Sequence, residues 1–292
     1  MSIELGVPGV EDLETAMTVM RGWPRDGMPV QLHPGDLGWN WSHGPRAAAA
    51  AVRTWTQDGR LVALGFLDEP RVLRVAIAHE AREDIALADR MLADLSDPDR
   101  GVLPAGEASV EARCGDALRA ALIADGWVDD EPWTPLVRDL SAPVEDVSLR
   151  VEVLGRHPEP DRLRDRVAVQ RAAFATSTFS ESRWRAMADG PAYADARCLV
   201  GYDESGAAVA TATVWSAGPG RAGLIEPLGV HRAHRGHGHG RAMTVACAAA
   251  LRELGSSSAM VCTPSANVGA VATYVSAGFT RQPDAPDLHR PA

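Results

Sequence analysis

The sequence lacks lysine, has few cysteines and contains no long apolar run. All 29 of its Lys/Arg positions are arginine. The four cysteines are scattered without C-x-x-C spacing, which argues against a disulfide framework or a zinc knuckle and favours buried free thiols. No stretch approaches the roughly 20 apolar residues that span a bilayer, so we expect no membrane insertion. The N-terminal stretch MSIELGVPGVEDLETAM has no basic segment followed by an apolar one, so we expect no secretory signal and a cytoplasmic protein.

An excess of positive charge is also absent. The formal net charge is -10, which argues against a nucleic acid as partner, because binding to a phosphate backbone needs a basic surface. A cationic substrate such as an amine is compatible with this charge. The composition, 46% apolar and 23% charged, is that of a globular protein. A length of 292 residues predicts two domains, each with its own core.

The two halves of the chain repeat one pattern. Residues 53–67 and residues 197–215 each read as two strands joined by a tight turn. A glycine-aromatic pair, Gly126-Trp127 in the first half and Gly278-Phe279 in the second, follows a predicted helix and opens a further strand. We infer a duplicated architecture, with a polar linker at 140–148 between the copies.

The predicted fold class is α+β, with two tandem domains that each contain a mixed, mostly antiparallel sheet flanked by helices. We place the domains at residues 1–145 and 146–292. The elements expected in the second half are a strand near 148–153, helices near 161–173 and 180–189, the hairpin at 197–215, a strand at 222–230, a helix ending near Leu254 and a final strand-helix-strand unit.

The stretch PLGVHRAHRGHGHGRAM, residues 227–243, is compatible with either a metal site or a phosphate site. Four histidines within nine residues suggest a metal, but interspersed arginines put fixed positive charge where a cation would bind. Arg235, Gly238 and Gly240 form R-x-x-G-x-G between a predicted strand and helix, where backbone N–H groups can approach a phosphate. We favour phosphate and expect no metal. The stretch lacks the third glycine of a dinucleotide-binding fingerprint at the correct spacing, and the absence of lysine excludes a Walker A loop.

The R-x-x-G-x-G pattern resembles the Q/R-x-x-G-x-G/A signature of the GNAT superfamily of N-acetyltransferases. In addition, NVGAVATYVSAGF (267–279) resembles the N-x-x-A-x-x-x-Y-x-x-x-G-F pattern of the family's last helix and strand. Both matches lie in the second half, which implies that this half binds acetyl-CoA as cosubstrate. The corresponding stretch of the first half, 78–91, has no glycine, and its HEARED segment (79–84) carries three carboxylates. The resemblance therefore implies a tandem GNAT protein with a degenerate first copy.

The resemblance also implies roles for single residues. Tyr274 is the candidate acid for the departing thiolate, and the alternative is a tyrosine packed in the core. Glu226 is the candidate base, direct or through water, and the alternative is a sheet-edge position facing solvent. Asn267 caps its helix, binds the cofactor, or does both. The full set of implied acetyl-CoA contacts is Leu228, Gly229, Val230, Arg235, Gly236, His237, Gly238, His239, Gly240, Arg241, Asn267 and Tyr274.

Pro227 predicts an irregular or splayed strand, because proline cannot donate to a β-ladder. Such splaying would admit the pantetheine arm of the cosubstrate, and the backbone N–H of Val230 would then face the thioester oxygen. Aromatic candidates for an acceptor pocket are Phe179, Trp184 and Trp215, although such residues more often belong to a core.

The function that the resemblance implies is acetyl-CoA-dependent N-acetylation of a small-molecule amine. The alternative is a non-catalytic acyl-CoA-binding or regulatory protein on the same fold. The sequence does not identify the acceptor, and it leaves open whether the chain is a monomer or a homodimer.

Overall fold

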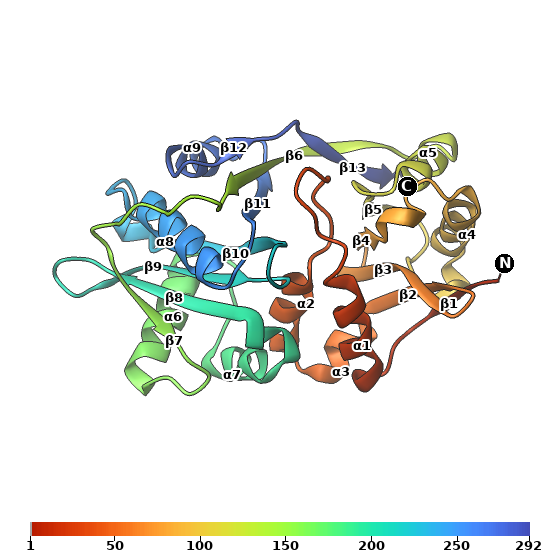
Figure 1. Cartoon of the computed structure of the whole chain (residues 1–292). Helices are drawn as coiled ribbons and strands as arrows, with labels where there is room; N and C mark the ends of the chain where they lie inside the picture. The colour runs from red at the N-terminus through yellow and green to blue at the C-terminus, as the bar shows by residue number, and fades with distance from the viewer. Residues whose placement is uncertain (1) are drawn as a thin grey trace.

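The computed structural model describes residues 2–292, with helices and strands in both halves (Figure 1). The first half contains β1 Ile3–Gly6, α1 Val10–Met20, α2 Pro34–Asn40, α3 Pro45–Ala50, β2 Val52–Gln57, β3 Arg60–Glu69, β4 Val72–Ile77, α4 Ile85–Ser96, β5 Ala108–Glu111, α5 Asp116–Ala124 and β6 Val128–Asp139. The second half contains β7 Arg150–Leu154, α6 Pro160–Ala173, α7 Glu181–Asp189, β8 Ala196–Tyr202, β9 Ala208–Trp215, β10 Ala222–Val230, α8 His239–Glu253, β11 Ser258–Pro264, α9 Val268–Ser276, β12 Thr280–Arg281 and β13 Ala285–Arg290.

The strands of both halves form one continuous mixed sheet. Its order is β1-β2-β3-β4-β5-β13-β6-β11-β10-β9-β8-β7, and β12 pairs with β6 off this path. Within residues 2–292, the parallel pairs are β4 with β5 and β10 with β11, one in each half. The predicted α+β class with mostly antiparallel pairing is confirmed. The two predicted sheets are joined edge to edge, since β6 of the first half pairs with β11 of the second.

The last strand of the chain crosses into the first half. β13 lies between β5 and β6 and is antiparallel to both. Leu288 of β13 is opposite Val110 of β5, and both side chains are fully buried. The C-terminus therefore lies beside the first half in Figure 1, close to α5. Each half thus depends on a strand supplied by the other.

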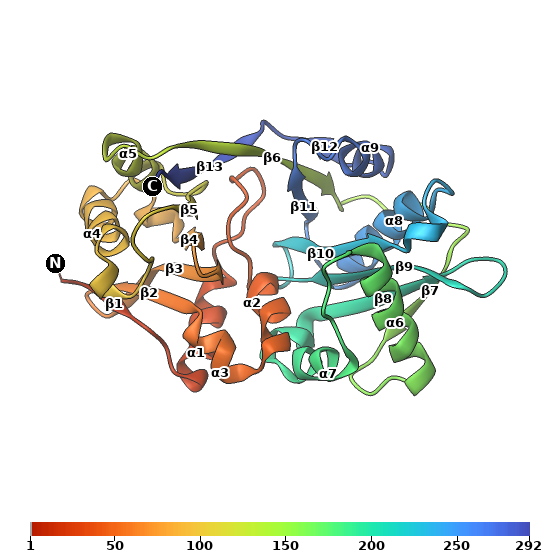
Figure 2. The same ribbon diagram turned by 180° about the vertical axis from the view of Figure 1, so that it is seen from behind.

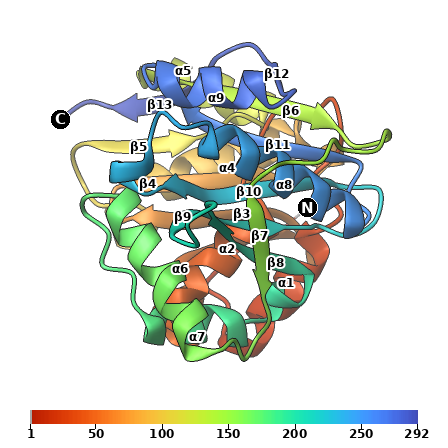
Figure 3. The ribbon, with the colours of Figure 1, turned by 90° about the vertical axis from the view of Figure 1, so that its left-hand side faces the viewer.

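Helices cover both faces of the sheet. Figure 1 and the view from behind in Figure 2 place α1, α2, α6 and α7 on one side, and α5, α8 and α9 on the other. Figure 3, turned by a right angle, shows the same two layers. α6 and α8 both pack against β9 and β10, so that β10 is sandwiched between two helices at the point where the candidate site lies.

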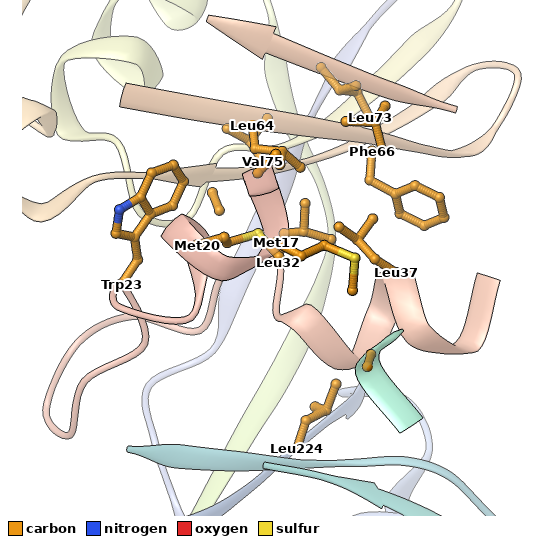
Figure 4. Packing of buried hydrophobic residues seen from close by; sticks show 14 of the residues in the cluster. Met17, Met20, Trp23, Leu32, Leu37, Leu64, Phe66, Leu73, Val75 and Leu224 are labelled. Atoms are coloured by element: carbon orange, nitrogen blue, oxygen red, sulfur yellow. The ribbon is translucent and has the colours of Figure 1, made fainter. Parts of the chain in front are cut away.

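The apolar core is not divided at the predicted domain boundary, because one cluster of buried residues extends through both halves, while a second cluster lies mainly in the second half, around β9, β10, β11 and α8. Figure 4 shows Leu224 of β10 pointing toward the first-half helix that carries Leu37. Trp215 of β9 packs directly on that helix, α2, where a Cβ added to Gly35 or Gly38 would lie 2.5 Å from the Trp215 side chain. Only glycine permits so close an approach between a helix backbone and an indole.

The local predictions for the second half agree with the structure to within about two residues. The helices near 161–173 and 180–189 are α6 and α7, and the hairpin is β8 with β9. α8 ends at Glu253 with Leu254 as its C-cap, and Gly255 follows in a left-handed conformation, with φ of 82°. No helix within residues 2–292 is both long enough and apolar enough to cross a membrane.

Candidate active site

β10 and β11 separate part-way along their length. Their parallel pairing covers Ala222 to Leu224 only, whereas β10 continues to Val230 and β11 turns to pair with β6. The register of β10 against β9 also shifts between Ile225 and Leu228. The predicted irregularity at Pro227 is therefore confirmed, and it opens a gap between two strands that would otherwise be hydrogen-bonded neighbours.

Backbone groups of β10 face this gap. The amide of His231 donates to Val209 O at 2.8 Å, and Gly229 is opposite Thr211 on the same side. Because hydrogen-bonded pairs alternate along an antiparallel ladder, the amides of Leu228 and Val230 point to the other edge, toward β11. The Val230 N–H is thus available to an atom placed between the strands.

The R-x-x-G-x-G loop leads into α8, which begins at His239. Gly236 and Gly238 have left-handed φ angles of 83° and 80°, and Gly238 occupies the N-cap position without any side-chain cap. The first N–H groups of a helix have no intrahelical acceptor, so those at the start of α8 are available to an anion. A Cβ added at Gly240 would lie 3.1 Å from Thr273 Cγ2. The second glycine of the motif therefore allows α8 to approach α9 closely.

Arginines beside the loop tie it to neighbouring elements. Arg235 Nη2 donates to Ala173 O at the end of α6 at 2.8 Å. Arg241 Nε donates to Ser276 O at the end of α9 at 2.9 Å. Both residues are anchored by a carbonyl and still line the groove beside the loop.

This groove, about 670 Å³ in volume, runs from the loop to the gap between β10 and β11. It is lined by the predicted acetyl-CoA contacts Leu228, Gly229, Val230, Arg235, Gly236, Gly238, His239, Gly240, Arg241, Asn267 and Tyr274. The exception is His237, which lines a different cavity, beside Asp203. No cluster of histidine, cysteine or carboxylate side chains within residues 2–292 is arranged to hold a metal ion.

A second cavity, of about 620 Å³, adjoins the groove from the side of the first half. The two share the side chains of Phe174, Leu228, Asn267, Ala270 and Tyr274. Asn267 also caps α9, because its side chain accepts the Ala270 N–H at 3.2 Å. The helix-cap role is therefore confirmed, and the same residue lies where it can contact a ligand.

Tyr274 lies where groove and cavity meet. The residue is 8% exposed, and its hydroxyl has no hydrogen-bond partner within residues 2–292. Burial, with smaller contributions from Cys247 and Glu226, raises the pKa of Tyr274 above its ordinary value, so the phenol is protonated at neutral pH. A protonated, unpartnered hydroxyl at this junction is suited to donate a proton.

Glu226 lies at the inner end of the second cavity, with its side chain 36% exposed. Its Oε1 is 3.7 Å from Arg74 Nη1, on β4 of the first half. Burial, and next the carboxylate of Asp36, raise the pKa of Glu226 well above its ordinary value, while Arg74 acts in the opposite direction. The carboxyl therefore takes up a proton more readily than a free glutamate, as a general base near neutral pH requires.

Arg74 connects Glu226 to further carboxylates. Its Nη1 is 3.0 Å from Asp36 Oδ1 on α2, and its Nε is 3.2 Å from Glu111 Oε2 on β5. The Arg74 side chain is 13% exposed and that of Asp36 is 1% exposed. Sequence analysis missed this network. A usable signal was an arginine inside the apolar strand VLRVAI, the same signal that singled out Glu226.

The aromatic residues predicted for the acceptor pocket belong to the core instead. Phe179, Trp184 and Trp215 are 2%, 0% and 1% exposed, and none of these three described residues lines the groove or the adjoining cavity. The indole of Trp215 donates to Glu226 O at 2.7 Å and packs on α2, so it positions β10 against the first half. These three side chains therefore follow the core alternative that the sequence left open, and they fill the junction between the halves.

In the first half, the strand edge that corresponds to the open edge of β10 is occupied. Beyond the β4–β5 pairing, Val75 O accepts the Leu32 N–H at 3.3 Å and the Ile77 N–H donates to Gln31 Oε1 at 3.2 Å. Residues 31–32 thus occupy the edge of β4 that corresponds to the open edge of β10. At the start of α4, the side chain of Asp84 accepts the Leu87 N–H at 3.1 Å and places a carboxylate where an anion would bind.

Comparisons with known proteins agree with this geometry. A model of the acetyltransferase (GNAT) family matches residues 165–279. Comparison with the sequences of curated proteins gives no match. A solved structure of a tandem GNAT protein from the clavulanic acid biosynthesis pathway superposes with a TM-score of 0.64 at 17% identity, covering 99% of this chain and 98% of that one.

Two further solved structures are similar over the same length. A GCN5-related N-acetyltransferase from Sphaerobacter thermophilus has a TM-score of 0.58 at 17% identity and covers 99% of this chain and 95% of its own. A GNAT-family acetyltransferase from Colwellia psychrerythraea has a TM-score of 0.59 at 14% identity, with 99% and 98% covered. Residues 165–279 therefore form a GNAT acetyltransferase-family domain, and the chain as a whole has the fold of a tandem GNAT protein.

Proposed function

We propose that the protein is an acetyl-CoA-dependent N-acetyltransferase of a small-molecule amine, with the catalytic site in residues 146–292. The observation that carries the proposal is the position of Tyr274. It lines both the groove beside the glycine loop and the cavity that contains Glu226. A thioester in the groove and an amine in the cavity would meet at this residue.

The groove fits acetyl-CoA in three respects. The free N–H groups at the start of α8 and the left-handed glycines suit a pyrophosphate. The gap between β10 and β11 suits an extended pantetheine arm, which would lie against the unpaired amides of Leu228 and Val230. Asn267 and Tyr274 close the inner end of the groove.

Glu226, Val230 and Tyr274 would each take a different part in acyl transfer. The thioester supplies an activated carbonyl carbon, to which the amine nitrogen forms a bond as the carbon–sulfur bond breaks. Glu226 takes the proton that the amine loses, directly or through water. The Val230 N–H faces the carbonyl oxygen as it gains negative charge, and the Tyr274 hydroxyl gives its proton to the departing thiolate.

The loop can be tested with Gly238→Val. A β-branched residue is strained at φ of 80° and would displace the N–H groups of the loop, so acetyl-CoA affinity should fall at least tenfold, or about 1.4 kcal/mol. Isothermal calorimetry measures the change. Gly206→Val is the matched control, because Gly206 has φ of 82° and equally open surroundings outside the groove. Equal affinities for the two variants would remove the phosphate assignment.

Each chain should bind one acetyl-CoA. We expect no second site in the first half, because residues 31–32 fill the edge of β4 and Asp84 caps α4. Calorimetric titration of the wild-type protein should give a stoichiometry of one. A value of two, or cofactor density beside Arg82 in a crystal structure, would contradict the assignment of residues 1–145 as a non-binding copy.

Tyr274→Phe separates an enzyme from a binding protein. The change removes one hydroxyl and keeps the ring, so acetyl-CoA affinity should be unchanged while kcat falls about a hundredfold. Release of CoA with an accepted amine measures the rate. Tyr193→Phe is the control, since Tyr193 is buried and its hydroxyl donates to Leu154 O away from both cavities. Equal rates for wild type and Tyr274→Phe would make the tyrosine a packing residue, and acetyl-CoA binding without any turnover would favour a regulatory protein.

The pH profile tests Glu226. A base must be deprotonated, so activity should rise with pH through the raised pKa of Glu226 and lose this limb in Glu226→Gln. Asp68 raises that pKa and Arg74 lowers it. Asp68→Asn should therefore move the limb to lower pH, and Arg74→Gln should move it to higher pH. The kcat/KM profile measures both shifts.

The matched control for the pH profiles is Glu253→Gln, on the exposed C-terminal end of α8. Thermal melting checks that Arg74→Gln folds, because it leaves buried carboxylates without their cation. The Asp68 side chain is 52% exposed, so Asp68→Asn should fold normally. This variant tests Glu226 as the base even if Arg74→Gln does not fold. An unmoved limb in folded Asp68→Asn and Arg74→Gln would exclude Glu226 as the titrating base.

A further inference from the structure

Both halves build the cavity beside Glu226. Its wall includes residues of β3, β4, β5 and β6, which face the second half's β10 and β11 across a space of about 620 Å³. The groove proposed for acetyl-CoA lies on the other side of Tyr274. If the function proposed above is correct, the acceptor therefore binds against side chains of the first half.

This cavity carries an excess of negative charge. Among the described residues that line it, six carboxylates (Asp68, Glu69, Glu111, Asp130, Glu226 and Asp287) oppose two guanidinium groups (Arg74 and Arg113). Both arginines are already matched. Arg74 pairs with Asp36, Glu111 and Glu226, and Arg113 pairs with Glu111 at 3.3 Å and Asp287 at 2.7 Å.

The inner wall is matched by this pairing. Asp287 is 8% exposed, and its Oδ1 lies 2.7 Å from Arg113 Nη2. Burial raises the pKa of Asp287 to about 7 against the opposing effect of Arg113. The inner carboxyl groups therefore already have a cation beside them, and the unopposed charge of the cavity lies at its rim.

The rim of the cavity carries carboxylates with no cation beside them. Glu69 ends β3 and Asp130 lies on β6, and both are exposed. Among the described residues, neither has an ion-pair partner, although the Ser109 hydroxyl donates to Asp130 Oδ2 at 3.1 Å. Asp68, next to Glu69, lies 3.9 Å from Arg74. A cation at the rim would therefore meet unopposed negative charge.

A single amine cannot satisfy both ends of the cavity. The reacting nitrogen must be neutral when it attacks, because its lone pair forms the new bond. The carboxylates at the rim, by contrast, attract a group that stays charged throughout the reaction. Binding energy from such a non-reacting group can position the reacting one.

We propose that the acceptor is an amine with a second, non-reacting cationic group, which binds at the rim formed by Glu69 and Asp130. The same charges disfavour an acceptor that carries a free carboxylate, such as an amino acid. The first half thus selects the substrate that the second half acetylates.

Three acceptors of matched length test the proposal with the wild-type protein. They are 1,4-diaminobutane, butylamine and 4-aminobutanoate, which share the reacting amine and a four-carbon chain. CoA release should give a kcat/KM about tenfold higher for the diamine than for butylamine, and lowest for the anion. The preference should shrink as ionic strength rises. Equal values for diamine and monoamine, or a preference for the anion, would overturn the proposal.

A double variant, Glu69→Gln with Asp130→Asn, locates the second cation. Both side chains are exposed, so the fold should be retained, and kcat/KM for the diamine should fall about tenfold with no change for butylamine. Asp89→Asn is the control, because Asp89 is an exposed carboxylate on α4 away from the cavity. An unchanged diamine preference in the double variant would reject the rim as its origin.

Calorimetry separates this proposal from the proposed function. If no acceptor releases CoA, the acetyltransferase assignment fails, but diamine and butylamine can still be titrated into the protein saturated with acetyl-CoA. Tighter binding of the diamine, lost in the double variant, would support the dicationic site without catalysis. Equal or undetectable binding of both would reject the site itself.

Discussion

The site depends on the ion pairs of the Arg74 guanidinium with three carboxylates. The guanidinium lies among Asp36 of α2, Glu111 of β5 and Glu226 of β10, and it is largely buried. Each of these carboxylates would be costly to bury alone, and removal of the shared cation would leave them uncompensated. The network therefore holds two halves of the chain in one relative position. It also modifies the proton affinity of Glu226, whose pKa is raised first by burial and next by Asp36, while Arg74 lowers it.

The same junction shows what the first half contributes to the candidate site. α2 packs on Trp215 through Gly35 and Gly38, and Trp215 in turn donates a hydrogen bond to the backbone at Glu226. β13 completes the sheet of the first half and brings Asp287 into the cavity wall. Residues 31–32 occupy the strand edge of the first half, while other elements of this half support and line the candidate site. Without the first half, the surfaces of the second half that contact β6 and α2 would be exposed, and the cavity would be open on one side.

Much of the fold could be predicted because its signals are local. Alternating apolar positions and a tight turn define the β8–β9 hairpin, and Gly255 marks the end of α8. Proline at 227 predicts that β10 cannot pair regularly, because it has no N–H to donate. Asn267 as helix cap follows from its own side chain. The exchange of β13 could not be predicted, because β5 and β13 are short and either half offers a compatible edge.

The sequence by itself determined the glycine loop at the start of α8, the splayed strand and the order of Glu226 and Tyr274 along the chain. These features depend on backbone conformations and on residues within a few positions of each other. Only the tertiary structure decided what surrounds Glu226. Arg74 and Asp36 lie more than a hundred positions away from it in sequence, and no local pattern links them to β10. Ion pairs and cavities between halves arise when separate elements pack, so the partners of a buried charge, and the chemistry of a substrate cavity, are properties of the assembled sheet.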